Sequence, residues 1–221
     1  ITVNPLPIIT NQTLSICSGN NFQLNLVNNP PNLLLPGNTT YTWPAPTIVP
    51  AATVTGSSAQ NNVNAITQTL INTTANSSTV TYQITPNSNA CVGNPFTLIV
   101  TVNPTPLIPS QTQTLCSGNS FSFTPTNNPP NTLIPSGILY SWGLPVSNPL
   151  GSVTGGTTGT IENTISEGII TNTTNTAATL VYSITGNSPQ LGACPSNAFT
   201  LTVTVNPSPV IGTQNTSICS G

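Results

Sequence analysis

Apolar and polar residues alternate along most of this chain. Phe22, Leu24 and Leu26 are separated by single polar residues, and the same spacing runs through residues 79–85 and 96–103. A period of two places apolar side chains on one face of a β-strand, whereas a helix would need them three or four positions apart. Proline and glycine interrupt these runs at short intervals, as turns between strands require. The pattern therefore predicts an all-β protein.

The sequence contains a long internal repeat. Thr-Val-Asn-Pro at residues 2–5 returns at 101–104 and at 204–207, at intervals of 99 and 103 residues. Cys-Ser-Gly-Asn at residues 17–20 returns at 116–119, again 99 residues later. Such an interval is too long for one turn of a solenoid and corresponds to one complete domain per repeat.

The repeats predict the domain organisation. The motif that begins at Cys219 stops after three residues, and the chain does not begin with methionine. We therefore expect the natural polypeptide to continue at both ends. The expected parts are the last strand of a preceding repeat (1–4), repeat one (5–103), repeat two (104–206) and the start of a further repeat (207–221).

Seven short strands are predicted in repeat one, which is the number in an immunoglobulin-like β-sandwich. Trp43 and Trp142 fall where the third strand of such a sandwich carries a core aromatic residue, and Tyr82 and Tyr182 fall in the sixth strand. We interpret all four as packing residues. Stacking of the tryptophans on a carbohydrate is the alternative, which the small number of aromatic residues disfavours. The predicted strands are 7–16, 21–27, 39–43, 47–55, 64–72, 79–85 and 96–103.

The predicted joints between repeats are rich in proline. Proline at alternate positions restricts the backbone to extended conformations and limits rotation. We therefore expect short, semi-rigid spacers and a head-to-tail rod of sandwiches. The prolines concerned are Pro5, Pro7, Pro104, Pro106, Pro207 and Pro209.

The order of the motifs resembles a known type of repeat. The motifs are Cys-Ser-Gly-Asn at 17–20, Tyr-x-Trp at 41–43, Asn-Thr-Thr at 72–74, the strand at 79–86, Cys91 to Phe96, and Val-Thr-Val-Asn-Pro at 100–104. Together they are similar to the PKD-like, immunoglobulin-like tandem repeats of very large cell-surface proteins of Bacteroidetes. Repeat two departs from repeat one at Ile169-Ile170 and in a longer loop before Phe199. The resemblance implies a gliding-adhesin-like protein, exported by the type IX system, that forms an extracellular stalk or adhesive filament.

Charged residues are almost absent from the chain. It has no Lys, Arg or His, and 92 of its 221 residues are Thr, Asn or Ser. Without basic side chains it cannot neutralise phosphates or anionic lipid headgroups, so we expect no nucleic-acid partner. No apolar run is long enough to span a bilayer, so we expect no membrane insertion in this segment.

The two acidic residues, Glu162 and Glu167, offer little catalytic chemistry. They have no acidic counterparts in repeat one, and no His or Lys is present to activate a nucleophile. We interpret both as solvated surface residues. The sequence also has no Cys-x-x-Cys motif and no acidic calcium loop. We therefore predict no enzyme activity, no cofactor and no metal.

Five cysteines are the main remaining candidates for chemistry: Cys17, Cys91, Cys116, Cys194 and Cys219. Disulfides are the expected state in an oxidising compartment, and free buried thiols are the alternative. One possibility is pairing within each repeat, which joins Cys17 to Cys91 and Cys116 to Cys194. The other joins Cys17 of repeat one to Cys194 of repeat two.

The topology of an immunoglobulin-like sandwich favours the second pairing. Cys17 precedes the second strand and Cys91 follows the sixth, which runs in the same direction. The two would lie about 23 Å apart across a strand of seven residues, too far for a disulfide. In a head-to-tail array Cys17 would instead lie near Cys194. Cys91, Cys116 and Cys219 would then need partners in other repeats.

Three functions fit these features. The repeats could be a load-bearing stalk, they could themselves bind glycans, surfaces or sister filaments, or they could be subunits of a noncovalent fibre assembled by strand donation. All three place the chain outside the cell, at the cell surface, with neighbouring repeats of the same chain as its first partners. Sequons for glycan attachment occur at Asn11, Asn38, Asn72, Asn76, Asn172 and Asn215.

Overall fold

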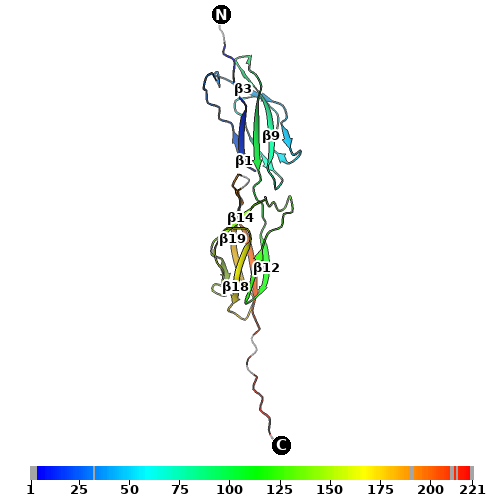
Figure 1. The fold of residues 1–221 in the computed structure, drawn as a ribbon, viewed down its shortest axis with the longest axis vertical. Helices are drawn as coiled ribbons and strands as arrows, with labels where there is room; N and C mark the ends of the chain where they lie inside the picture. The colour runs from blue at the N-terminus through cyan, green and yellow to red at the C-terminus, as the bar shows by residue number, and fades with distance from the viewer. Residues whose placement is uncertain (1–3, 32, 190–191, 210–211, 213, 220–221) are drawn as a thin grey trace. The chain divides into compact units, whose positions relative to one another are not determined.

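The computed structural model describes residues 4–31, 33–189, 192–209, 212 and 214–219. In these residues the long elements are all β-strands and no α-helix occurs, which confirms the predicted all-β class (Figure 1). No membrane-spanning helix is found in this described part of the chain. Most of the predicted segment 1–4, namely residues 1–3, lies outside it.

The chain divides into two compact units. The first consists of Ile1–Ile108, Pro125–Leu139 and Gly186–Asn197, and the second of Pro109–Thr124, Tyr140–Thr185 and Ala198–Gly221. Two loops of repeat two, at 125–139 and 186–197, thus belong to the first unit.

The larger sheet of repeat one has the strand order β1-β11-β9-β3-β6, with β4 and β10 also paired to β9. Strand β1 runs parallel to β11, from Gln12 opposite Leu98 to Cys17 opposite Asn103. The end of β1 is therefore fixed beside the end of the last strand of the repeat. The bounds are β1 (Gln12–Cys17), β3 (Thr40–Trp43), β4 (Thr47–Val49), β6 (Gln60–Val63), β9 (Ser78–Ser88), β10 (Cys91–Val92) and β11 (Phe96–Asn103).

The opposite face of repeat one is covered by two short antiparallel pairs, β2 with β7 and β5 with β8. Their bounds are β2 (Asn21–Gln23), β5 (Val54–Thr55), β7 (Thr67–Thr69) and β8 (Ile71–Asn72). The alternation of β9 and β11 places one apolar side chain in two against these pairs, so that residues such as Val80, Tyr82, Leu98 and Val100 are fully buried. The predicted period of two thus builds the core.

Repeat two follows the same plan. Its larger sheet has the order β12-β21-β19-β14-β17, with β15 and β20 paired to β19, and its second sheet has the order β13-β18-β16. The bounds are β12 (Gln111–Cys116), β13 (Asn119–Phe123), β14 (Leu139–Trp142), β15 (Val146–Asn148), β16 (Val153–Thr154), β17 (Gly159–Glu162), β18 (Ile165–Asn172), β19 (Ala178–Ser188), β20 (Cys194–Pro195) and β21 (Phe199–Asn206).

The structure corrects several predicted strand bounds. The first strand of repeat one begins at Gln12 rather than at residue 7, and the second ends at Gln23 rather than at residue 27. The predicted strand 47–55 is divided into β4 and β5, because Pro50 lacks the N–H that a ladder needs. Strand β6, with the polar sequence Gln-Asn-Asn-Val, was not predicted because it has no apolar alternation.

Candidate functional site

The most distinctive chemical feature of the structure is a disulfide between Cys17 and Cys194. Their Cα atoms are 5.6 Å apart, and the two residues are separated by 177 positions in the sequence. This is the pair that the sandwich topology favours. The alternative disulfides, Cys17–Cys91 and Cys116–Cys194, are not formed. The thiols of Cys91, Cys116 and Cys219 are free.

The motif Cys-Ser-Gly-Asn forms a tight turn after β1. The Ser18 N–H donates to the Asn103 carbonyl at 2.8 Å, and the Asn20 N–H donates to the Cys17 carbonyl at 3.1 Å. Gly19 adopts a left-handed backbone with a φ of 86°, which glycine adopts at low cost. Its N–H donates to the Leu70 carbonyl at 2.8 Å. The turn fixes Cys17 at one end of the sheet.

Asn72 holds this turn from the opposite sheet. Its Nδ2 donates to the carbonyls of Asn76 and Val102, and its Oδ1 accepts from the N–H and the hydroxyl of Thr74. The Ser18 hydroxyl donates to the Asn72 carbonyl at 3.2 Å and accepts from the Asn72 N–H at 2.9 Å. Because Asn72 is buried and all its polar atoms are used, the repeated Asn-Thr-Thr motif has a structural role.

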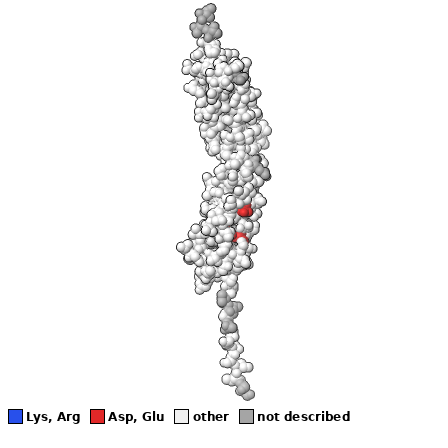
Figure 2. Space-filling model, turned by 60° about the vertical axis from the view of Figure 1, so that its left-hand side comes forward, with Lys and Arg blue, Asp and Glu red and all other residues white. Residues whose placement is uncertain are grey.

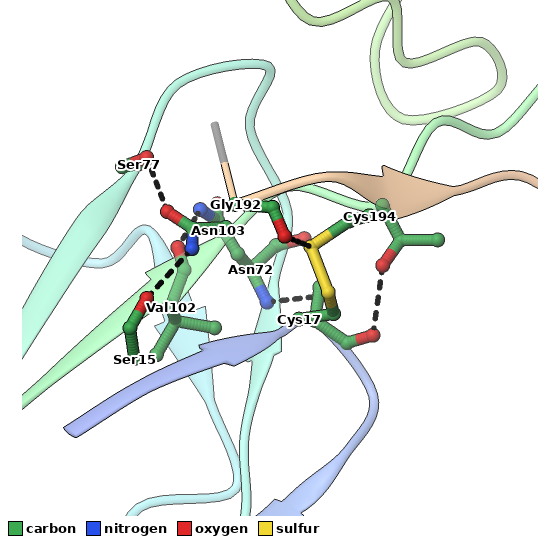
Figure 3. Close-up of a disulfide and its surroundings, with 10 residues drawn as sticks. Ser15, Cys17, Asn72, Ser77, Val102, Asn103, Gly192 and Cys194 are labelled. Atoms are coloured by element: carbon green, nitrogen blue, oxygen red, sulfur yellow. Dashed lines mark hydrogen bonds between the residues drawn. A yellow bond between two sulfur atoms is a disulfide. The ribbon is translucent and has the colours of Figure 1, made fainter. Parts of the chain in front are cut away.

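Asn103 completes what we call the Cys17 corner, made of Cys17, Ser18, Asn72, Asn103 and Thr105. The Asn103 Nδ2 donates to the Ser15 hydroxyl, and the Ser77 hydroxyl donates to the Asn103 Oδ1, both at 2.8 Å (Figure 3). The Thr105 hydroxyl donates to the Ser18 carbonyl at 3.0 Å. These hydrogen bonds hold the corner together independently of the disulfide.

The loop that carries Cys194 covers this corner. Cys194 is fully buried, and it begins β20 opposite Ser188. A Cβ atom at Gly192 would collide with the side-chain amide of Asn103, and Gly192 has a φ of 79°. Only glycine fits this approach without strain. The disulfide therefore lies beside the close contact between the Gly192 backbone and the Asn103 side chain, within the first compact unit (Figure 3).

Residues 9–106 and 113–209 each match the model of the PKD-like domain family. The chain belongs to this family. PKD-like domains in tandem are typical of extracellular structural or adhesion repeats, and the fold is typically non-enzymatic. Such domains together with a disulfide are consistent with an extracellular location. No curated protein sequence matches the chain.

Several solved structures are similar to the chain. One holds the N-terminal four Ig domains of Dscam1 isoform 1.9, with 13% identity and a TM-score of 0.31, over 94% of this chain and 45% of that one. Human CDH23 EC21-23 has 12% identity and a TM-score of 0.32, over 92% and 70%. Human mucin-like protocadherin EC1-2 has 10% identity and a TM-score of 0.30, over 90% and 97%. The chain spans less than half of the Dscam1 structure.

The second PKD-like domain contains an equivalent corner, the Cys116 corner, made of Cys116, Ser117, Asn172, Asn206 and Ser208. The Ser117 N–H donates to the Asn206 carbonyl at 2.8 Å, and the Asn172 Nδ2 donates to the Thr176 and Val205 carbonyls. The Ser208 hydroxyl donates to the Ser117 carbonyl at 3.0 Å. Unlike Cys17, Cys116 is exposed and unpaired.

The four predicted core aromatics pack inside the PKD-like domains. Trp43 is 2% exposed, and Trp142 is 7% exposed. The Trp43 Nε1 donates to the Ser58 carbonyl at 2.9 Å, and its ring meets that of Tyr82 edge-on at 6.1 Å. Tyr182 is fully buried. So little exposed area leaves no ring face for sugar stacking, and the packing interpretation fits the structure.

The two glutamates differ, which corrects the expectation that both are solvated. Glu162, at the end of β17, is exposed, but Glu167, in β18, is only 6% exposed. The Glu167 carboxylate accepts from the Thr157 N–H at 3.0 Å and from the Thr157 hydroxyl at 2.7 Å. Burial, together with the Glu167 charge, raises the pKa of Tyr182. Two small acidic patches and no basic ones appear on the surface in Figure 2.

In the first PKD-like domain Gln68 occupies the place of Glu167. The Gln68 Nε2 donates to the Ser58 carbonyl at 2.8 Å, and its Oε1 accepts from the Tyr82 hydroxyl at 2.7 Å. Gln68 thus bridges the two sheets of its domain, whereas the hydrogen bonds of Glu167 go to Thr157, in the segment between β16 and β17. The equivalent tyrosine hydroxyl, on Tyr182, has no hydrogen-bond partner among the described residues. Sequence reasoning missed both buried groups, because an isolated polar residue in an alternating strand gives no signal of burial. Within the described residues, no group of three His, Cys, Asp or Glu side chains that could hold a metal ion was found.

Proposed function

We propose that this chain is a non-enzymatic, load-bearing segment of an extracellular stalk or filament that belongs to a large cell-surface adhesin. The observation that supports it most is the Cys17–Cys194 disulfide, which spans 177 positions. Tension that enters the chain before Cys17 can pass through the disulfide to Cys194 and leave toward the C-terminus. Residues 18–193 then carry no part of the load along the covalent backbone.

The disulfide limits how far the chain can extend. A fully extended chain spans about 3.4 Å per residue, so the stretch between Cys17 and Cys194, with a sequence separation of 177, corresponds to about 600 Å of extension that tension cannot draw out. A tether that contains such a link keeps its length under load. Closing so long a loop also lowers the conformational entropy of the unfolded chain. In the chain-entropy model this stabilises the folded state by about 5 kcal/mol.

The surface composition fits the same function. The chain offers no Lys or Arg to trypsin-like proteases, and it has almost no charge for salt to screen. Disulfides persist in oxidising extracellular compartments. We further propose that the repeats run from 5 to 103 and from 104 to 206. The proline joints between them act as semi-rigid spacers in a head-to-tail rod. The protein is exported by the type IX system of a Bacteroidetes cell.

Single-molecule force spectroscopy of the chain, held at its two termini, tests the load path. In the oxidised chain we expect unfolding to release only the residues outside the loop closed by Cys17 and Cys194. After reduction, or in C17S, the total extension should rise by about 600 Å. Equal extensions in the oxidised and reduced chains would contradict the load-bearing function.

A binding measurement tests spacing against direct adhesion. The oxidised chain is applied to a glycan array and to glass and polystyrene surfaces, next to the complete adhesin. We expect the chain to bind far more weakly than the adhesin. If it binds equally well, the repeats themselves are adhesive and the stalk is not their main function.

A further inference from the structure

We propose that the Cys116 corner is a docking site that forms a disulfide with the cysteine loop of another copy of this repeat. The proposal rests on the load-bearing function and adds the partner of its free cysteines. The corner reproduces the hydrogen bonds that Asn72, Ser18 and Thr105 make in the Cys17 corner, which holds a loop cysteine in this structure. The bonded Cys17 corner thus shows which ligand this arrangement accepts.

Equivalent residues beside the two corners differ in exposure. Asn103, Pro104 and Pro106 are buried beside the Cys17 corner. Their equivalents beside the Cys116 corner are not: Asn206 and Pro209 are exposed, and Pro207 is half-buried.

A hollow lies at the open corner. It is lined by Thr173, Thr174, Asn175, Pro207, Ser208 and Pro209. These residues follow the buried Asn172 and the strand end at Asn206, which both belong to the corner. The hollow shares Ser208 with the Cys116 corner, and the Cys116 side chain itself is exposed, as a site for an incoming loop requires.

The complementary half of the contact is also present in the chain. Cys91 begins β10 opposite Ser88, as Cys194 begins β20 opposite Ser188. Asn89 and Ala90 before Cys91 have positive φ, as Gly192 and Ala193 have before Cys194. Yet Cys91 is half-buried and unpaired, whereas Cys194 is fully buried and bonded. Each repeat thus presents one corner cysteine and one loop cysteine.

The cross-link forms by thiol–disulfide exchange with a small disulfide, for which oxidised glutathione serves as the reagent. The Cys116 thiolate attacks one sulfur of glutathione disulfide, forms a mixed disulfide and releases one glutathione thiolate. The loop-cysteine thiolate then attacks the Cys116 sulfur and releases the second glutathione. Two protein thiols are oxidised to one disulfide, their two protons pass to the two glutathione thiolates, and one glutathione disulfide is reduced to two glutathione thiols.

If every corner is bonded in this way, two covalent routes run through an array of repeats. Each route follows the backbone from the loop cysteine of one repeat to the corner cysteine of the next, and then crosses a disulfide to another loop cysteine. The backbone part from Cys91 to Cys116 is 25 positions long. This stretch contains β11, a proline joint and β12, which are already extended. At full extension 25 residues span about 85 Å, so the loaded segments hold little slack.

Two variants of the 221-residue chain separate the two halves of the contact. C91S/C219S retains only the free Cys116, and C116S/C219S retains only the free Cys91. Each is incubated alone and as an equal mixture in a glutathione redox buffer, and dimers are measured on non-reducing gels. Peptide mapping identifies the bonded cysteines and verifies that Cys17–Cys194 is intact.

We expect disulfide dimers in the mixture, joined through Cys116 and Cys91, at least tenfold more abundant than in either variant alone. A control, T112C/C91S/C116S/C219S, carries an exposed thiol on the same strand, outside the corner, and should give no excess of dimers when mixed with C116S/C219S. Cys116–Cys116 dimers as abundant as mixed dimers, equal dimerisation by the control, or no dimers would each overturn the docking site. The extension limit set by Cys17–Cys194 is measured separately and would stand.

Discussion

The Cys17 and Cys116 corners have nearly the same hydrogen bonds but different surroundings. In both, a buried asparagine donates to two backbone carbonyls, one of them in the last strand of its repeat. Only the Cys17 corner is covered by a loop, and only there is the asparagine at the strand end buried. The comparison teaches that each repeat builds its corner from its own residues, whereas the cover comes from a loop far along the chain.

The largest expected effect is the loss of the disulfide at the covered corner. C17S removes the cross-link across 177 positions, and we expect the free energy of unfolding to fall by about 5 kcal/mol. C116S, at the equivalent but unpaired position, should change it by less than about 0.5 kcal/mol. Chemical denaturation of both variants measures the difference. Similar losses in the two variants would show that the covered corner gains nothing from its cross-link.

The next effect should be equal in the two corners. N72A and N172A each remove a buried amide with four hydrogen-bonding contacts, and we expect each to cost about 3 kcal/mol. N76A, at an exposed asparagine nearby, is the control and should cost less than about 0.5 kcal/mol. Thermal and denaturant unfolding provide the measurement. If N172A leaves the free energy of unfolding nearly unchanged, the hydrogen bonds of the Cys116 corner do not form without a covering loop.

A smaller and asymmetric effect is expected at the two equivalent buried positions, Gln68 and Glu167. Q68E removes the amide that donates to the Ser58 carbonyl and buries a charge, so we expect a cost of about 2 kcal/mol. In E167Q, one amide oxygen keeps the Thr157 N–H as its donor, and the amide group can donate to the Thr157 hydroxyl. Because both hydrogen bonds are retained, we expect a change within about 1 kcal/mol. Denaturation of both variants tests this, and a costly E167Q would mean that the second repeat depends on its buried charge.

The smallest expected effect on stability comes from the cover itself. G192A places a methyl group against the Asn103 amide at a left-handed backbone position, and we expect a cost of about 1 to 2 kcal/mol. It should also speed the reduction of Cys17–Cys194 by dithiothreitol. G168A is the control, because Gly168 has no neighbour within 4 Å of an added Cβ. Equal reduction rates in the two variants would show that the Gly192 contact does not protect the bond.

The fold class was predictable because the apolar alternation in β9 and β11 is strong enough to define a buried face. Strand ends were less predictable, since they depend on proline and on pairing partners: Pro50 divides one predicted strand, and β6 pairs without any apolar alternation. The favoured cysteine pair followed from strand direction together with the expected head-to-tail order of the repeats. Strand direction follows from topology, which a repeat with seven strands largely determines.

The internal bonding of the corners was not predictable from sequence. Asn72 is part of a glycosylation sequon, and only its burial shows that it binds the backbone instead. The burial of Glu167 was likewise hidden, because its partner Thr157 lies on a different segment, ten positions earlier. Contacts between side chains of separate segments need the three-dimensional register, which periodicity does not provide.

The spacing of the cysteines adds a requirement for folding. Cys91 and Cys116 both lie closer to Cys17 along the chain than its partner Cys194 does. In an unfolded chain a shorter loop closes at a lower entropic cost, so oxidation of unfolded chains favours the nearer cysteines. A first domain that folds before its thiols are oxidised holds Cys17 at one end of its sheet, away from Cys91. Folding before oxidation therefore guards the chain against a wrong bond.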